Sequence, residues 1–179
     1  FLNYISGANC DVPIGKIVYT QFLNEDGGIE ADVTVTRLSE LSFMVVTPAA
    51  TRLADQTWML RHSINFNIVI IDVTSAEGVL AIMGPNSRKL LSQISSADLS
   101  NQNNPFGTAQ EVEIGMGLAR IHRVSFVGEL GWEVYATSDQ AGHIFEVIAD
   151  AGQEMGLKFC GMHMMDSCRI EKGFRHFWA

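Results

Sequence analysis

The chain has 179 residues, 47% hydrophobic and 18% charged, which is enough for one large folded domain or two small ones. Its formal net charge of −8 argues against nucleic acid as a partner, since neutralising phosphates requires a clustered basic face. The apolar runs are too short to cross a bilayer and the first residues do not resemble a signal peptide, so we expect no membrane association. Three widely spaced cysteines form no disulfide framework, which favours a reducing compartment.

The first half of the sequence predicts a three-stranded meander and a helix, preceded by a short helix that ends near Gly7. The turn of the first hairpin is the run Asn24 to Gly28, NEDGG. A Gly-Pro-Asn-Ser turn at 84–87 starts a further helix. The expected elements are strands at 16–23, 29–38, 42–47, 67–74 and 79–83, and helices at 51–62 and 88–94.

The second half opens with a polar stretch from Ser95 to Gly107, which is the best candidate for a surface loop between two lobes. We then expect strands at 108–114, 117–126, 132–136 and 157–160, and helices at 139–155 and 166–177. Strand-rich units alternate with single helices twice, which favours an α+β fold of two ferredoxin-like lobes, 1–96 and 107–179, around a loop at 97–106. The abrupt ends suggest a fragment whose flanking domains are missing on both sides.

Two stretches place carboxylates in apolar surroundings. In IEADVTV, alternation puts Asp32 on the face opposite Ala31 and Val33, where an outward, solvated side chain is the simpler interpretation. In GELGWEVY, Glu129 and Glu133 flank a turn, and a carboxylate there could accept a paired N–H edge of a ligand. The pair alone is weak evidence for glycosidase chemistry.

The C-terminal region offers polar groups with more than one interpretation. Cys160, His163 and Cys168 lack the spacing of a zinc site, so we expect no metal and favour a packed core helix. In DSCRIEKGFRHF, Asp166 could cap a helix and Arg169 could be an ordinary surface cation. Arg169 could equally face inward as a bidentate donor to a carboxylate.

Four motifs together resemble the folate-binding aminomethyltransferase family. They are YTQFLNEDGGIEADVTVTRL, VLAIMGPNSRKLL, FVGELGWEVY and GMHMMDSCRIEKGFRHFW, and they occur in family order and spacing over nearly the whole chain. The family includes the T-protein of the glycine cleavage system, and the chain is more similar to the C-terminal module of dimethylglycine and sarcosine dehydrogenases. The resemblance therefore implies a folate-binding fold.

The resemblance also implies roles for individual residues. Asp32 matches the acid that lies near the reacting nitrogens of tetrahydrofolate, and Tyr19 matches an aromatic residue of the same cleft. Glu133 matches the residue that holds the amino and ring N–H groups of the pterin, and Arg169 matches an arginine of the folate-site helix. Further cofactor-binding positions implied by the resemblance are Thr47, Phe126 and Trp178.

Three positions depart from the T-protein pattern. Ala31 replaces the first of two adjacent aspartates, Phe126 replaces a tyrosine, and Thr47 replaces an asparagine. The aromatic surface at Phe126 is kept, but a hydroxyl and an amide are lost. These changes resemble the dehydrogenase-linked branch more than the T-protein itself.

By resemblance, the chain is a tetrahydrofolate-dependent one-carbon transfer module of an enzyme that oxidises N-methylated glycine. The one-carbon donor would be an iminium made by an FAD domain of the same polypeptide, outside this sequence. The expected compartment is the bacterial cytoplasm or the mitochondrial matrix. A tetrahydrofolate-dependent demethylase and a non-catalytic regulatory homologue are the alternatives.

Overall fold

The computed structural model describes residues 1–175, which form two compact units divided between Val73 and Thr74. Both units combine helices with antiparallel strands, so the α+β architecture predicted from the sequence is confirmed. No helix among the described residues is long and apolar enough to cross a membrane. Trp178, implied by resemblance as a cofactor-binding residue, lies outside the described residues.

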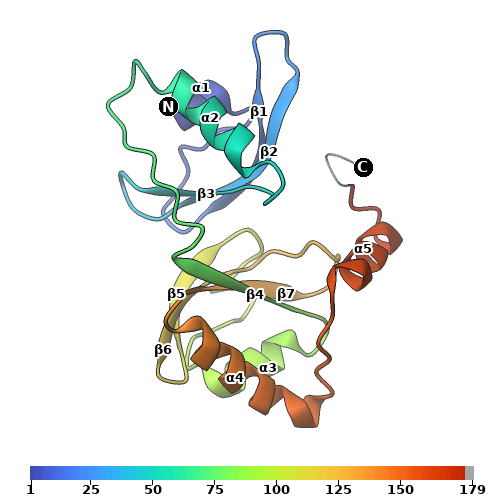
Figure 1. Cartoon of the computed structure of the whole chain (residues 1–179). Helices are drawn as coiled ribbons and strands as arrows, with labels where there is room; N and C mark the ends of the chain where they lie inside the picture. Colours follow the sequence, from blue (N-terminus) through green and yellow to red (C-terminus); the bar gives the residue numbers. More distant parts are fainter. Residues whose placement is uncertain (176–179) are drawn as a thin grey trace. The chain divides into compact units, whose positions relative to one another are not determined.

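Unit 1 is a three-stranded meander with two helices (Figure 1). Its strands pair antiparallel in the order β1-β2-β3, as the sequence predicts. Alternate residues of β2 are buried, and Phe22, Val33 and Val35 form the core with Trp58 of the long helix packed against it. The elements are α1 (Leu2–Ile5), β1 (Ile17–Leu23), β2 (Ile29–Arg37), β3 (Phe43–Val46) and α2 (Arg52–His62).

A β-bulge interrupts the β1–β2 hairpin close to its turn. Leu23 lies opposite Ile29, but Phe22 already lies opposite Ala31, so β2 carries one extra residue. Beyond the bulge, Asp32 is paired with Gln21. Side chains of paired residues share a face of the sheet, so this register decides which residues surround Asp32.

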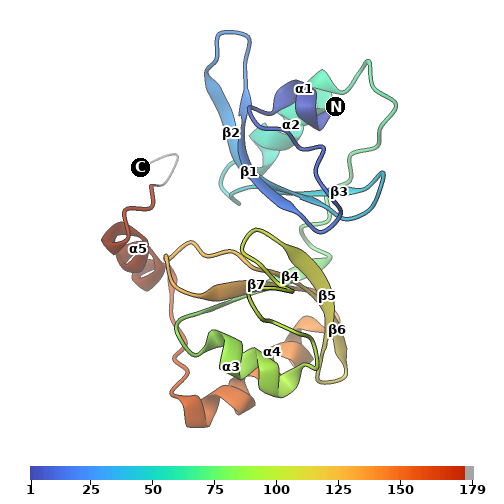
Figure 2. The ribbon, with the colours of Figure 1, turned by 180° about the vertical axis from the view of Figure 1, so that it is seen from behind.

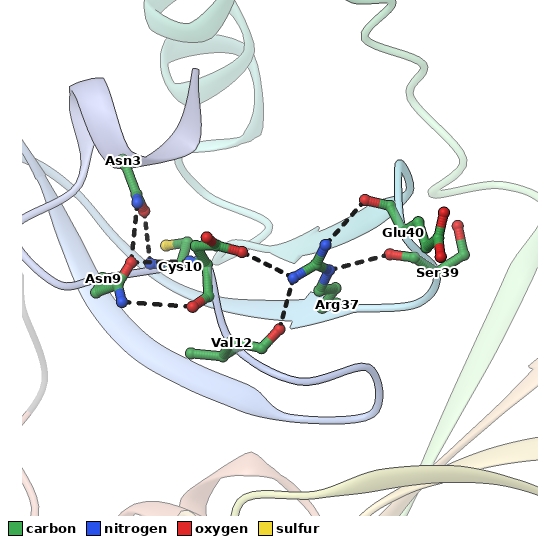
Figure 3. A network of polar contacts seen from close by, with 8 residues as sticks. Asn3, Asn9, Cys10, Val12, Arg37, Ser39 and Glu40 are labelled. Carbon is green, nitrogen blue, oxygen red and sulfur yellow. Dashed lines mark hydrogen bonds and ion pairs between the residues drawn. The ribbon is translucent and has the colours of Figure 1, made fainter.

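Arg37, at the end of β2, ties the chain before β1 to the turn after β2 (Figure 3). Its Nη1 donates to Asp11 at 2.8 Å and to the backbone oxygen of Val12 at 2.9 Å. Its Nε and Nη2 donate to the backbone oxygens of Ser39, at 3.2 Å, and Glu40, at 3.1 Å. One fixed guanidinium therefore satisfies backbone acceptors of two separate loops.

Unit 2 is a four-stranded antiparallel sheet in the order β4-β7-β6-β5, with α3 and α4 on one of its faces (Figures 1 and 2). Its core lies between that face and the helices and includes Leu91, Ile121, Trp132, Val134 and Ile144. The elements are β4 (Glu77–Met83), α3 (Ser87–Ile94), β5 (Ala109–Ile114), β6 (Gly117–His122), β7 (Gly131–Thr137), α4 (Ala141–Gly152), η1 (Gln153–Met155) and α5 (Met162–Glu171).

Two predicted strands, at 67–74 and 157–160, are absent from the described structure. Val69 and Ile71 are exposed over 83% and 73% of their surface. Their side chains are therefore not buried against a sheet, which is what favours apolar residues in strands. The predicted strand at 117–126 ends at His122, where its pairing with β7 ends. Apolar composition alone therefore overestimated the strand content.

The C-terminal helix also differs from its prediction. It begins at Met162 rather than Asp166, and it ends at Glu171 because Gly173 adopts a left-handed φ of +73°. It is not a packed core helix: His163 is exposed, and Arg169 is its one buried residue. No group of acidic, histidine or cysteine side chains among the described residues could hold a metal ion.

The division of the chain lies earlier than the sequence predicts. Residues 97–106 form a loop without helix or strand, but that loop belongs to unit 2. The preceding β4 pairs with β7 along its whole length, which joins residues 77–96 to unit 2. The boundary between the two units is therefore set by a pairing between distant strands, which local composition does not reveal.

Candidate functional site

Two side chains of β1 hydrogen-bond to the carboxylate of Asp32, one to each oxygen. Its Oδ2 accepts a hydrogen bond from the Tyr19 hydroxyl and its Oδ1 accepts one from the Gln21 amide, each at 2.8 Å. Tyr19 and Gln21 are two residues apart in one strand, so they share the face of the sheet that carries Asp32. The carboxylate thus has a fixed plane, and each oxygen keeps a lone pair for a ligand.

The Tyr19 hydroxyl is kept protonated as the donor of this pair. Desolvation raises the pKa of Tyr19, and the hydrogen bond to the Asp32 carboxylate raises it further. The ring itself is exposed over 63% of its surface, which leaves an aromatic face available to a ligand. Asp32 is therefore a half-buried carboxylate that two side chains orient.

Thr47 takes part in a second polar cluster of unit 1, around the buried Asp55 of α2. Both Thr47 and Thr51 donate hydroxyl hydrogen bonds to Asp55 Oδ2, the latter at 2.6 Å. The other oxygen of Asp55 has no hydrogen-bond partner among the described residues. Because the Thr47 hydroxyl donates its hydrogen to Asp55, its oxygen remains able to accept a hydrogen bond from an N–H group.

Glu133 lies on the face of the unit 2 sheet that the helices do not cover. Its neighbours Trp132 and Val134 are fully buried in the core, and alternation turns Glu133 to the other side. Its Oε2 accepts a hydrogen bond of 2.6 Å from the hydroxyl of Tyr135. Burial raises the pKa of Tyr135, and the Glu133 charge adds to the rise, so Tyr135 remains a donor.

His122 completes this cluster. It lies opposite Glu133 in the β6–β7 register, and its ring is 4.3 Å from that of Tyr135. Only 1% of its surface is exposed, and its Nε2 has no hydrogen-bond partner among the described residues. Desolvation, reinforced by the charge of Arg120, lowers the pKa of His122 from 6.5 to about 4, so the ring is neutral at pH 7.

Arg169 is buried rather than an ordinary surface cation. Its Nε donates to Asp166 at 2.7 Å, and its Nη1 donates to the backbone oxygen of Phe174 at 3.1 Å. Asp166 lies one turn inside the helix and pairs with Arg169, so it is not the helix cap that the sequence suggested. The guanidinium also stacks over the Phe126 ring at 5.9 Å, which brings two expected folate-site residues together.

Glu129 has a structural role in the turn before β7. Its Oε1 forms an ion pair of 2.9 Å with Lys172, which raises the pKa of that lysine. Both side chains are more than two-fifths exposed, so this pair adds little to stability. The two carboxylates of GELGWEVY therefore differ, and only Glu133 belongs to the buried cluster.

The expected site residues fall into separate groups: Tyr19 with Asp32, Thr47 with Asp55, Glu133 with Tyr135, and Phe126 with Arg169. Sequence reasoning missed four of the partners, and one of them could have been found. Tyr135 is two residues from Glu133 on one strand face. Gln21 depends on the bulge in the hairpin register, and Asp55 and His122 have no local signal either.

The description of the matching family is GCVT N-terminal domain, and the match covers residues 1–179. The chain belongs to that family. Three of its expected family positions, Tyr19, Asp32 and Glu133, are hydrogen-bonded in the way described above.

Among curated relatives, the chain is 44% identical over 169 residues to a formaldehyde-forming 4-methylaminobutanoate oxidase of Paenarthrobacter nicotinovorans, covering 94% of this chain and 20% of that protein. It is 34% identical to the mitochondrial sarcosine dehydrogenase of Mus musculus, covering 99% of this chain and 21% of that protein. The chain thus spans about a fifth of the length of these relatives.

A solved structure supports the fold. The glycine cleavage system aminomethyltransferase T from Bartonella henselae superposes with a TM-score of 0.83 at 26% identity, covering 98% of this chain and 46% of that chain. The resemblance read from the four motifs is confirmed at the level of the family and of the fold.

Proposed function

We propose that this protein binds tetrahydrofolate and transfers a one-carbon unit at the methylene level to it. The observation that carries the proposal is the Asp32 carboxylate, which Tyr19 and Gln21 fix on an accessible sheet face. A carboxylate that is already oriented can accept a proton without paying again for its reorganisation. Family membership supports the same assignment.

The Glu133 carboxylate fits the hydrogen-bond donors of a reduced pterin. A pterin presents an amino group and ring N–H groups side by side, and Glu133 offers a carboxylate whose orientation Tyr135 fixes. The exposed Tyr19 ring and the Phe126 ring are aromatic surfaces that could stack on such a ligand. We assign pterin binding to Glu133 and chemistry to Asp32, with Thr47 and Arg169 as further folate contacts.

The proposed reaction balances without another reactant. Two new bonds join the iminium carbon to two folate nitrogens, and the bond between that carbon and the donor amine breaks. The two hydrogens lost by the folate nitrogens end on the released amine, so no net proton is made. Asp32 takes one of these protons from a folate nitrogen and returns it to the departing amine. Its negative charge stabilises the cationic donor.

The donor is proposed from the relatives. One of them is named for forming formaldehyde from a methylamino acid and another is named a sarcosine dehydrogenase, so both oxidise N-methyl groups. We infer that the iminium is made by an FAD-containing part of a longer protein, in a bacterial cytoplasm or a mitochondrial matrix. This chain would then capture the one-carbon unit before it is released to water.

Isothermal titration calorimetry with 5-formyltetrahydrofolate tests the proposal. We expect saturable binding to the wild type and weaker binding to Asp32→Ala and Glu133→Ala. The exposed hairpin acid Asp26 supplies a matched control, since Asp26→Ala removes the same charge from the same hairpin. A wild type that does not bind folate would favour the regulatory homologue. Unchanged affinity in Glu133→Ala would refute the pterin assignment.

The demethylase alternative makes a different prediction. A demethylase would move an intact methyl group, so its product would be 5-methyltetrahydrofolate rather than the methylene form. A screen that pairs tetrahydrofolate with sulfonium donors and with the iminium formed from formaldehyde and an amine, each against a blank without protein, distinguishes the two products by mass.

A further inference from the structure

Two arginines of unit 2 share a single acceptor. Arg88, on α3, and Arg123, directly after β6, both donate to Oδ1 of Asn101 through their Nη2 atoms, at 2.6 and 2.7 Å. Because both nitrogens contact one oxygen, at 2.6 and 2.7 Å, they lie at most the sum of these distances apart, where like charges repel appreciably. Desolvation lowers the pKa of Arg123, and the repulsion from Arg88 lowers it further.

No carboxylate neutralises this pair among residues 1–175. Neither guanidinium forms an ion pair there, and the Nε of Arg88 is buried without a hydrogen-bond partner. Asp98, the one acid in the loop 97–106, is engaged by Asn103 at 2.5 Å and by the backbone N–H of Ser100 at 2.8 Å. Two positive charges therefore meet at one neutral amide oxygen.

The geometry around the pair is fixed. Both guanidinium carbons lie over the Trp132 ring, at 5.7 Å for Arg88 and 5.6 Å for Arg123. The Trp132 indole N–H donates to Asn104 Oδ1 at 2.6 Å, and the backbone oxygen of Asn104 accepts from Arg123 Nη1 at 2.5 Å. Asn101 is exposed, so the shared end of the two guanidiniums faces solvent while their inner sides rest on the indole.

This place is separate from the proposed folate contacts. Trp132 and Glu133 are neighbours in β7 and point to opposite faces of the sheet. The arginine pair thus lies on the side of the helices, and Glu133 lies on the other side. Nothing in the one-carbon chemistry uses these residues.

We propose that Arg88 and Arg123 form a binding site for a phosphate-class oxyanion. Two guanidiniums carry two positive charges and offer forked N–H donors, which match the charge of nearly −2 and the several acceptor oxygens of a phosphate group. A single carboxylate would neutralise one charge only. The ligand is either free phosphate or the phosphate group of a larger molecule, and it would join or replace Asn101 as the shared acceptor.

Phosphorus NMR and calorimetry with inorganic phosphate test the site. We expect saturable binding to the wild type, and at least tenfold weaker binding to Arg88→Gln and to Arg123→Gln. The matched control is Arg61→Gln, which removes an exposed arginine of α2 and should leave the affinity unchanged. Acetate should bind at least tenfold more weakly than phosphate. If a phosphate ester such as glycerol phosphate binds more tightly than inorganic phosphate, the ligand is the phosphate group of a larger molecule.

A second variant covers the case in which either glutamine variant fails to fold. Asn101→Asp places a carboxylate between the two guanidiniums, so it should raise the melting temperature and abolish phosphate binding. No saturable phosphate binding by the wild type would overturn the proposal. Equal phosphate affinity of the wild type and of Asn101→Asp would also overturn the proposal. The two arginines would then serve only to hold Trp132.

Discussion

The buried His122 makes stability depend on pH in a way that can be calculated. Its pKa is about 4 in the folded protein against 6.5 for an ordinary histidine, so the unfolded chain binds a proton more readily between these values. Stability is therefore complete above pH 6.5 and falls as the pH drops toward 4. From pH 7.5 to pH 5 the histidine should cost about 2 kcal/mol of unfolding free energy.

Replacing the group isolates its contribution. In His122→Gln the side chain no longer titrates, so the loss of stability between pH 7.5 and pH 5, measured by urea unfolding, should be about 2 kcal/mol smaller than in the wild type. The exposed His163 supplies the control, because His163→Gln makes the same chemical change outside the buried cluster. If His122→Gln loses as much stability as the wild type, then the Glu133 carboxylate across the ladder stabilises a charged imidazolium, and the reasoning from desolvation is wrong.

Two further predictions concern Asp32 and the turn before β7. Gln21→Leu should weaken 5-formyltetrahydrofolate binding by roughly tenfold, because one oxygen of Asp32 loses its donor, whereas the exposed Gln93→Leu should not change the calorimetric affinity. Gly128→Ala should lower the free energy of unfolding by roughly 1–3 kcal/mol, because Gly128 has a φ of +69° and an added Cβ would lie 2.6 Å from Cγ of Lys172. Gly161→Ala, where nothing lies within 4 Å of the new Cβ, is its control in the same thermal melts, and equal effects of the two would contradict the steric argument.

The hairpin shows how far sequence reasoning reaches and where it stops. Alternation in IEADVTV correctly assigned Ala31, Val33 and Val35 to the core and Asp32 to the opposite face. Counting back from the turn without a bulge would have placed Asp32 opposite Thr20, a core residue, and Gln21 opposite Ala31. The extra residue in β2 corrects the register, and no pattern in NEDGGIEAD announces it.

The same contrast holds in unit 2. The period of two in GWEVYAT separates the buried Trp132 and Val134 from Glu133 and Tyr135, and that separation is visible in the sequence. Which residue of β6 lies across from Glu133 depends on strand order, and β7 pairs with β6 on one side and β4 on the other. His122 therefore joins the cluster only through a pairing between strands distant in sequence.

The sequence by itself determined the α+β class, most of the strands and helices, the family and the acids worth examining, because these follow from local periodicity, turn residues and motif order. Only the tertiary structure decided the hydrogen-bond partners of Asp32 and Glu133, the burial of His122 and Arg169, and the meeting of Arg88 with Arg123 at Asn101. Each of these depends on groups far apart in the chain, and their desolvation and charges exist only once the strands are paired and packed.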